Sequence, residues 1–211
     1  MTLFLFSAIP AAILSFIVSR KFEIHSNVLK PGMLFILFGI LSGVIVSLLN
    51  FRFPSLNQNP SGVIDTLMYT IFKVGLIEES GKFLLFQFGL FFIISEELKT
   101  RNVIILFSIM TGLGFALIEN FSYASNYGIS VLISRSLIAM PMHMCCGFLL
   151  GWFLTSSIKY KVIIAISAAS LLHGIYDFWA FSGFRILAIL TFVVSMQFMF
   201  IEINKLKANG K

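Results

Sequence analysis

The stretch that decides the fold runs from Val74 to Ile94 and reads VGLIEESGKFLLFQFGLFFII. It is long and apolar enough to cross a membrane, yet two adjacent glutamates, Glu78 and Glu79, lie inside it. A charged carboxylate at bilayer depth costs about 2.5 kcal/mol or more. Two neighbouring carboxylates also repel each other, so at least one is expected to be protonated or held by a cation. Such a costly pair indicates a functional site inside a membrane.

The composition of the whole chain agrees with that interpretation. Of its 211 residues, 58% are hydrophobic and 11% are charged, whereas a soluble domain has about a quarter charged residues. We therefore expect an all-α, polytopic membrane helical bundle that forms a single domain over residues 1–211. The net charge of +6 does not indicate a nucleic-acid partner, because the basic residues lie mostly in short loops between apolar segments. The adjacent Cys145 and Cys146 are expected to pack as small apolar residues.

Seven apolar segments are each near or above the ~20 residues that a span needs. They run over residues 3–19, 32–50, 63–94, 103–124, 131–157, 162–181 and 185–203. The first lacks a basic region before it and is followed by Arg20 and Lys21, which predicts a retained anchor rather than a cleaved signal peptide. The third is too long for a simple span, so we expect part of it to protrude or to break near Gly75 or Gly81.

The basic residues of the loops predict the orientation. One set of alternate loops carries Arg20, Lys21, Lys30, Lys99, Arg101, Lys159, Lys161, Lys205, Lys207 and Lys211, and the other set carries only Arg52 and Arg185. This asymmetry places the N-terminus outside and the C-terminus in the cytoplasm, as an odd number of spans requires. We expect the chain to lie in a bacterial plasma membrane. Lys73, Lys82 and Arg135 fall inside segments and are candidates to balance acidic groups there.

Further ionisable residues lie at a similar depth in other segments. At 1.5 Å per residue, Glu78 and Glu119 lie about 24 Å from the cytoplasmic ends of their segments. The corresponding depths are about 21 Å for His143, about 17 Å for His173 and about 23 Å for Asp177. In a core of about 30 Å, that layer lies in the outer half of the membrane. A shared depth predicts one shared site.

Local spacings support a shared site. Lys82 lies four and three residues after the two glutamates, and Asp177 lies four residues after His173, so each pair can share a helix face. Phe115 shares a face with Glu119 in the same way. Gly112 and Gly114 favour close helix approach near Glu119, and Pro141 favours a bend just before His143.

Other polar residues have simpler interpretations. Asp65 is expected at the interface, and Lys73 is expected to extend toward it. Arg135 lies near the outer surface as an anchor or as a neighbour of the site. Asn120, Tyr123 and Asn126 are candidate rim residues.

Two chemical routes suit this set of side chains. Two histidines with carboxylates are typical ligands of Zn²⁺, with one carboxylate left to activate water, and Glu119, His143 and His173 are the candidate ligands. Without a metal, a buried glutamate could act as the general base while a histidine stabilises the oxyanion. In either route Glu78 and Glu79 are the candidate water-activating or ligand carboxylates. Asp177 is expected to orient His173, and Lys82 to balance the glutamate pair. No HExxH motif is present.

Three motifs on separate segments resemble the signatures of the PrsW intramembrane proteases. They are Glu78-Glu79-x-x-Lys82, Phe115-x-x-x-Glu119 and His173-x-x-x-Asp177. The stretch GLGFALIENFSYA, Gly112 to Ala124, is similar to that family, and His143 resembles a further histidine between the second and third signatures. The resemblance covers Ala12 to Ile203.

The resemblance implies an intramembrane endopeptidase, and the family is commonly described as metalloproteases. It also implies kinship with the CAAX-processing protease and bacteriocin-protection family and, more distantly, with the Aph-1 scaffold. The expected substrate is a single-span membrane protein cut near the extracytoplasmic side. An anti-sigma factor, cut at the first site, is the substrate of the best-known relative.

Two alternatives remain open from the sequence. The polar layer could serve a transporter or channel, although the inner halves of the segments are mostly apolar and offer few polar residues such as Gln87. A non-catalytic scaffold could also have this fold, although a scaffold would have no need of so many costly charges.

Overall fold

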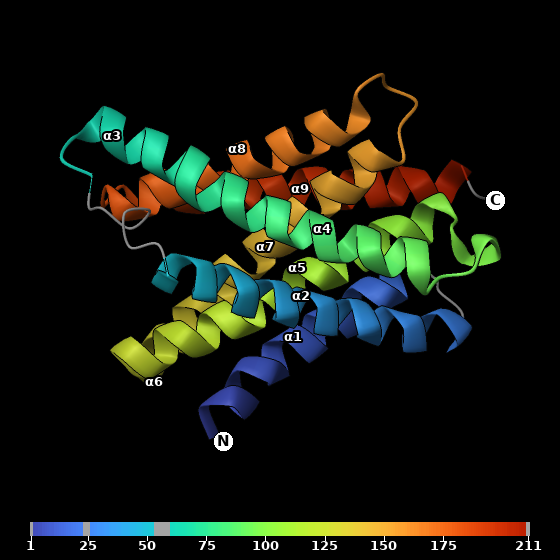
Figure 1. The fold of residues 1–211 in the computed structure, drawn as a ribbon, viewed down its shortest axis with the longest axis horizontal. Coiled ribbons are helices and arrows are strands. Elements are labelled where there is room, and N and C mark those ends of the chain that lie inside the picture. Colours follow the sequence, from blue (N-terminus) through green and yellow to red (C-terminus); the bar gives the residue numbers. More distant parts are fainter. Residues whose placement is uncertain (1, 23–25, 53–59, 210–211) are drawn as a thin grey trace.

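The computed structural model describes residues 2–22, 26–52 and 60–209, and the regular elements within these ranges are helices. Five long helices are α1 (Thr2–Lys21), α2 (Ser26–Arg52), α5 (Arg101–Tyr127), α8 (Lys161–Phe181) and α9 (Arg185–Asn209). Two composite helices join short pieces: α3 (Val63–Met68), η2 (Tyr69–Gly75) and α4 (Leu76–Phe92), and then α6 (Ile129–Ser134), η4 (Arg135–Ala139) and α7 (Met140–Leu154). A single turn, η3 (Glu96–Leu98), precedes α5. Together they form one bundle (Figure 1).

These helices correspond to the seven predicted segments, so the prediction of an all-α membrane bundle is confirmed for the described residues. Six of the described helices are long and apolar enough to cross a membrane. The composite helix over residues 63–92 is not among the six, and it carries the most charge. Its crossing, and the direction of every crossing, stay predictions.

Of the two alternatives for the third segment, a protruding part or a break near Gly75 or Gly81, the break is wrong. The chain stays helical from residue 63 to residue 92, and a π-helical stretch, η2, takes the place of a break. A π-helical turn keeps the backbone groups paired, whereas a break at membrane depth would leave them unsatisfied. The second π-helical stretch, η4, lies just before Pro141, which lacks an N–H and cannot complete the α-helical pattern. Both stretches adjoin the polar residues predicted to form the site.

Helix α5 lies at the centre of the bundle, between α1, α2 and α7. Its residues from Ile105 to Leu117 are all buried. A Cβ built on Gly112 would lie 2.5 Å from the carbonyl oxygen of His143, so the backbones of α5 and α7 touch at this point. The predicted close approach near Glu119 is therefore confirmed, and only glycine permits it.

The two ends of the bundle differ in character. We call the end at which α2, α5 and α8 finish the α3 end, because α3 lies there (Figure 1). Toward the opposite end the core is aromatic: the ring of Phe35 stacks on Phe107 at 4.4 Å and meets Phe86 edge-on at 5.7 Å. The buried polar residues lie on the other side of this core, nearer the α3 end.

Candidate active site

The seven predicted site residues form one connected cluster of ion pairs and hydrogen bonds. Helix α4 contributes three of them, α5 and α7 one each, and α8 two. They are Glu78, Glu79, Lys82, Glu119, His143, His173 and Asp177. Residues from four helices therefore meet, as the shared depth predicted.

Glu79 lies at the centre of the cluster and is fully buried. Its Oε1 accepts hydrogen bonds from Lys82 Nζ at 2.7 Å and from His173 Nδ1 at 2.8 Å. Lys82 is also buried, so the pair is shielded from solvent. A buried carboxylate needs such partners, because an unpaired one would carry a large desolvation cost. Glu79 thereby joins α4 to α8.

Lys82 does more than balance the glutamates. Its Nζ lies 3.0 Å from Nδ1 of His143 and 4.1 Å from the centre of the Phe115 ring. Because an ammonium group can only donate, Nδ1 of His143 must accept this bond. The imidazole proton then lies on Nε2, which donates to Glu119 Oε2 at 2.7 Å. The contacts of Lys82 thus determine the tautomer of His143.

Arg135 completes the surroundings of Glu119. Its Nη2 lies 2.8 Å from Glu119 Oε2, and its Nε donates to Asn120 Oδ1 at 2.9 Å. Its guanidinium also lies 3.7 Å from the centre of the Tyr123 ring. Of the two roles considered for Arg135, the structure supports the one at the site. Asn126 lies elsewhere and donates to the carbonyl of Ser122 in its own helix.

His173 lies between three carboxylates. Its Nδ1 is bonded to Glu79, and its Nε2 lies 3.4 Å from Asp177 Oδ2 and 3.8 Å from Glu78 Oε2. The shortest of these contacts involves Glu79, so Glu79 holds the ring more firmly than Asp177 does. The rings of His143 and His173 meet edge-on with centres 4.8 Å apart.

Among the residues that the structure describes, two groups of side chains have ligand atoms close enough to hold a metal ion. One is Glu78 with His143 and His173, and the other is Glu79 with Cys146 and His173, the atoms of each lying within 4.8 Å of one another. The Oε2 atoms of Glu78 and Glu79 are buried without a hydrogen bond among the described residues. Imidazole and carboxylate ligands with buried unpaired oxygens suit a divalent cation such as Zn²⁺.

The predicted ligand set differs from these groups. Glu119, expected beside both histidines, belongs to neither group and is instead bonded to His143 and Arg135. Cys146, expected to serve only in packing, belongs to the second group. Its position three residues after His143, on the same face of α7, is the sequence signal that could have indicated it.

A cavity of about 230 Å³ opens beside the cluster. Glu78, Glu119 and Asp177 line it, together with residues of α2 and η2. Glu79 and Lys82 do not line it. The cluster therefore has a layer of carboxylates that face the cavity and a buried layer that holds them.

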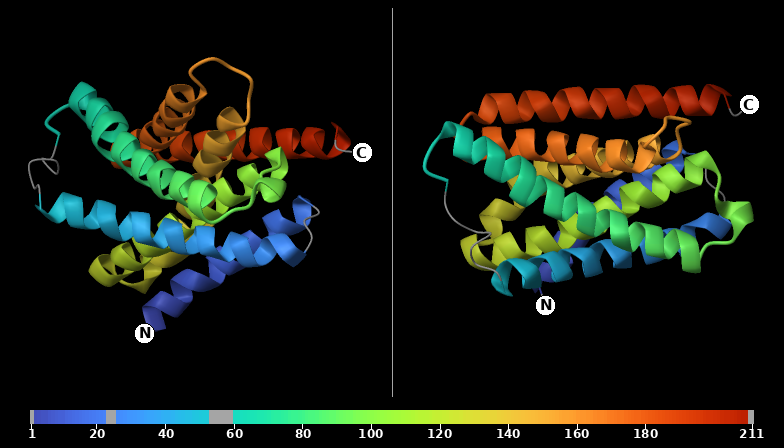
Figure 2. Two further views of the ribbon diagram at one scale, coloured as in Figure 1. Left: turned by 45° about the vertical axis from the view of Figure 1, so that its right-hand side comes forward. Right: turned by 45° about the horizontal axis from the view of Figure 1, so that its top comes forward.

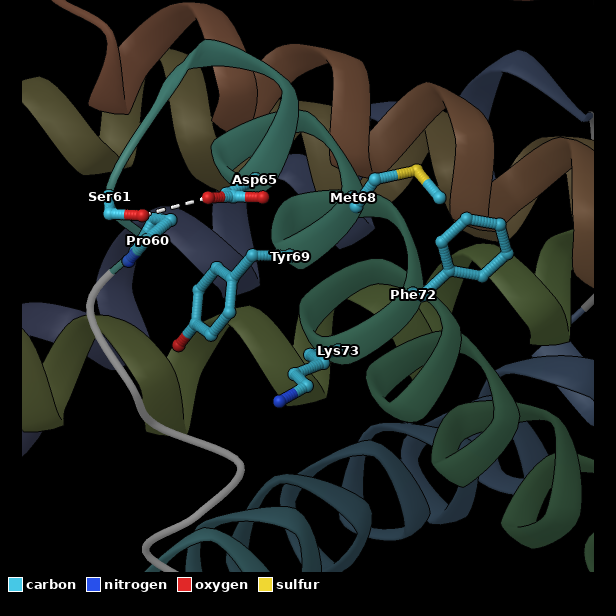
Figure 3. Close-up of a pocket in the computed structure, with 7 residues that line it drawn as sticks. All are labelled: Pro60, Ser61, Asp65, Met68, Tyr69, Phe72 and Lys73. Carbon is cyan, nitrogen blue, oxygen red and sulfur yellow. Dashed lines mark hydrogen bonds between the residues drawn. The ribbon is translucent and has the colours of Figure 1, made fainter.

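Asp65 and Lys73 lie outside the cluster, as expected. They line a separate pocket of about 410 Å³ near the start of the composite helix, where the Ser61 hydroxyl donates to Asp65 Oδ2 at 2.8 Å (Figure 3). Both are exposed. Tyr69 lines this pocket and the site cavity as well.

Comparison with known proteins agrees with the motifs. Residues 31–202 match the model of a family described as PrsW family intramembrane metalloprotease. The chain is 30% identical to Protease PrsW of Clostridioides difficile (strain 630) over 222 aligned positions, which cover 97% of this chain and 90% of that protein. It is 28% identical to Protease PrsW of Shouchella clausii, with 74% of each chain covered, and 32% identical to that of Bacillus subtilis, with 35% of this chain and 37% of that protein covered. No solved structure matches the chain.

Proposed function

The chain belongs to the PrsW family of intramembrane metalloproteases, and from that premise we propose that it cuts a single-span membrane protein near the extracytoplasmic end of its span. Family membership favours the protease over the transporter and the scaffold considered from the sequence. The substrate class follows from the membrane location of the cluster, where a soluble protein would have no access.

The loop charges support the position of the cut. The basic residues of the loops predict that the α3 end faces the outside, and the site cavity lies toward that end. An anti-sigma factor, cut at the first, outer site before further steps release its sigma factor, is a substrate of this kind.

The observation that carries the chemistry is the difference between the two adjacent glutamates. Glu78 lines the cavity and makes no hydrogen bond among the described residues, with His173 Nε2 3.8 Å from its Oε2, whereas Glu79 is buried and bonded to Lys82 and His173. We assign Glu78 as the carboxylate that takes the proton of the attacking water. Glu79 is the positioning residue that holds His173.

The other residues have roles that follow from their contacts. His173 directs Nε2 toward Glu78 and Asp177, where it can donate a hydrogen bond to the oxygen that gains charge or a proton to the leaving amine. Glu119 keeps His143 in place, and Arg135 holds Glu119. Phe115, against Lys82 and His143, helps to exclude water from the buried layer.

A divalent metal fits the donor set. Glu78 and His173 would hold it in place of the proton-transfer roles given above, and His143 would join them through Nδ1, the nitrogen without a proton, by exchanging its bond from Lys82 for the ion. When bound, the ion would act as a Lewis acid toward the scissile carbonyl. Zn²⁺ is the ion that these ligand types favour.

The experiment compares cells that express the wild-type chain or the Glu78→Gln variant. New protein termini in the membrane fraction are identified by mass spectrometry. We expect wild-type-specific termini in the outer halves of single-span proteins. Identical termini in both samples would refute the proteolytic role of Glu78, and termini in cytoplasmic halves would refute the proposed side of cleavage. The purified enzyme with each identified substrate, with and without a chelator, then tests the metal.

A further inference from the structure

Helix α2 and the composite helix over residues 63–92 pack closely along one half and separate along the other. Away from the α3 end, Phe38 meets Phe88 with ring centres 6.0 Å apart. The helices cross where a Cβ built on Gly81 would lie 2.9 Å from Val46 Cγ2. Beyond this crossing the two helices diverge toward the α3 end (Figure 2).

The site cavity occupies the space between the diverging halves. Ser47 and Asn50 line it from α2, and Tyr69 and Val74 line it from η2. Both elements carry exposed apolar side chains near the cavity, such as Leu48 of α2, with 61% of its surface exposed, and Phe72 of η2, with 52%. Exposed apolar residues of a membrane protein face lipid, so the cavity lies beside the lipid.

The lining of the cavity is suited to a peptide backbone. Four hydroxyl groups line it, and within the described residues none of them makes a hydrogen bond; they belong to Ser47, Tyr69, Ser122 and Tyr123. A membrane helix must unwind locally before a peptide bond in it can be attacked, and this frees N–H and C=O groups. Inside a membrane such groups are tolerated only where protein or enclosed water satisfies them.

We propose that the substrate's span enters sideways from the lipid between the α3-end halves of α2 and η2, and that its unwound segment binds in this cavity. Ser47 and Tyr69 form the two sides of the entrance, and the backbone of the segment bonds to the cavity hydroxyls beside Glu78. The inference rests on the proposed function and adds to it the entry route and the residues that bind the substrate backbone.

A second groove provides a rival route that can be tested. It lies between α8 and α9, measures about 390 Å³ and is lined mainly by apolar residues such as Leu190 and Val194. None of the predicted site residues lines it. A span in that groove would have no direct access to Glu78.

The first experiment locates a bound span by photo-crosslinking. A photoreactive phenylalanine analogue replaces Ser47, Leu48 or Val194 in the full chain carrying Glu78→Gln, reconstituted in vesicles. The probe is a fluorescent Leu/Ala peptide of about 24 residues, enough to span the bilayer, with Gly-Ser-Gly in its outer third. We expect crosslinks from Ser47 at least tenfold above those from Leu48 and Val194. Equal labelling from Leu48, or stronger labelling from Val194, would overturn the entry route.

The second experiment measures cleavage of the same peptide by active enzyme. Ser47→Trp should fill the entrance and lower kcat/KM at least tenfold, mainly through KM. Leu48→Trp, one residue along α2 and facing lipid, should change it less than twofold. If Ser47→Trp cleaves normally, the entry route is wrong. If Ser47 crosslinks while the wild-type enzyme cleaves no single-span protein, the route stands and the proposed function fails.

Discussion

Glu79 and His173 lie 94 positions apart in the chain, yet Glu79 Oε1 and His173 Nδ1 are 2.8 Å apart. This contact joins α4 to α8 in the middle of the cluster. It connects the first and third sequence motifs, and the same oxygen also accepts a bond from Lys82 within the first motif. It also separates the roles of two adjacent glutamates, since Glu78 has no such bond and faces the cavity.

The first prediction distinguishes Glu78 from Glu79. Glu78→Gln should abolish cleavage and leave the thermal unfolding temperature in detergent unchanged, because Glu78 Oε2 makes no hydrogen bond. Glu79→Gln should abolish cleavage and also lower the unfolding temperature, because it leaves the buried Lys82 without its charged partner. Equal unfolding temperatures for both variants would contradict the division of roles.

The second prediction concerns the buried ion pair. Glu79→Gln and Lys82→Met should each cost about 3 kcal/mol of unfolding free energy, because each leaves one buried charge unpaired. The double variant should cost less than the sum by about 1 kcal/mol or more. Unfolding in mixed detergent micelles measures the four free energies.

The exposed pair Glu202 and Lys205 serves as the matched control. It has the same spacing and the same 2.7 Å contact, but the Lys205 side chain is 63% exposed. The same comparison of two single variants and the double variant at this pair should give a coupling free energy of about 0–1 kcal/mol. Equal coupling at both pairs would show that burial is not what strengthens the Glu79–Lys82 contact.

The third prediction concerns Arg135. Arg135→Gln should lower kcat about 10–100-fold with little change in KM, because Glu119 would lose the partner that orients it toward His143. Arg135→Lys should not restore the rate, since one ammonium cannot reproduce the bonds from Nη2 to Glu119 and from Nε to Asn120. Arg185→Gln, exposed and at the same end of the bundle, should retain normal kinetics. Full activity of Arg135→Lys would show that Arg135 contributes only its positive charge and not its two directed hydrogen bonds.

The fourth prediction concerns the approach of α5 to α7. Gly112→Ala would place a Cβ 2.5 Å from the carbonyl oxygen of His143, so the helices must move apart. The bond between His143 and Glu119 should lengthen, and cleavage should fall at least tenfold. Gly62→Ala, whose Cβ would meet only Asp65 Oδ2 at 3.9 Å, is the control and should behave as wild type. Normal cleavage by Gly112→Ala would show that the cluster tolerates this displacement.

The fifth prediction separates the two possible ligand groups of a metal. If Glu78, His143 and His173 hold the ion, Glu78→Gln should lower the metal content of the purified protein and Cys146→Ala should not. Elemental analysis after removal of excess metal measures both, without any activity assay. Loss of metal from Cys146→Ala alone would assign the ion to the group with Glu79.

The sequence predicted much of this site because the cost of a buried charge can be judged from local composition. The long apolar segments predicted the helices, and the ionisable residues within them predicted which helices would meet. The roles of Arg135 and Cys146 in the site were less clear from the sequence. Arg135 lies near the outer end of its apolar segment, where an interfacial anchor would also lie, and Cys146 is as apolar as its neighbours, so the sequence did not identify the side chains that each one contacts.

By itself, then, the sequence determined that the chain is a helical membrane protein and that Glu78, Glu79, Glu119, His143 and His173 share a site. Both follow from the hydropathy of the segments and from the free-energy cost of a charged side chain inside a membrane. Only the tertiary structure decided which glutamate faces the cavity and which is buried. Adjacent helical residues point about 100° apart, so their surroundings depend on how the helix is rotated in the bundle. Packing against α2, α8 and α5, together with the π-helical stretch before Glu78, determines that rotation.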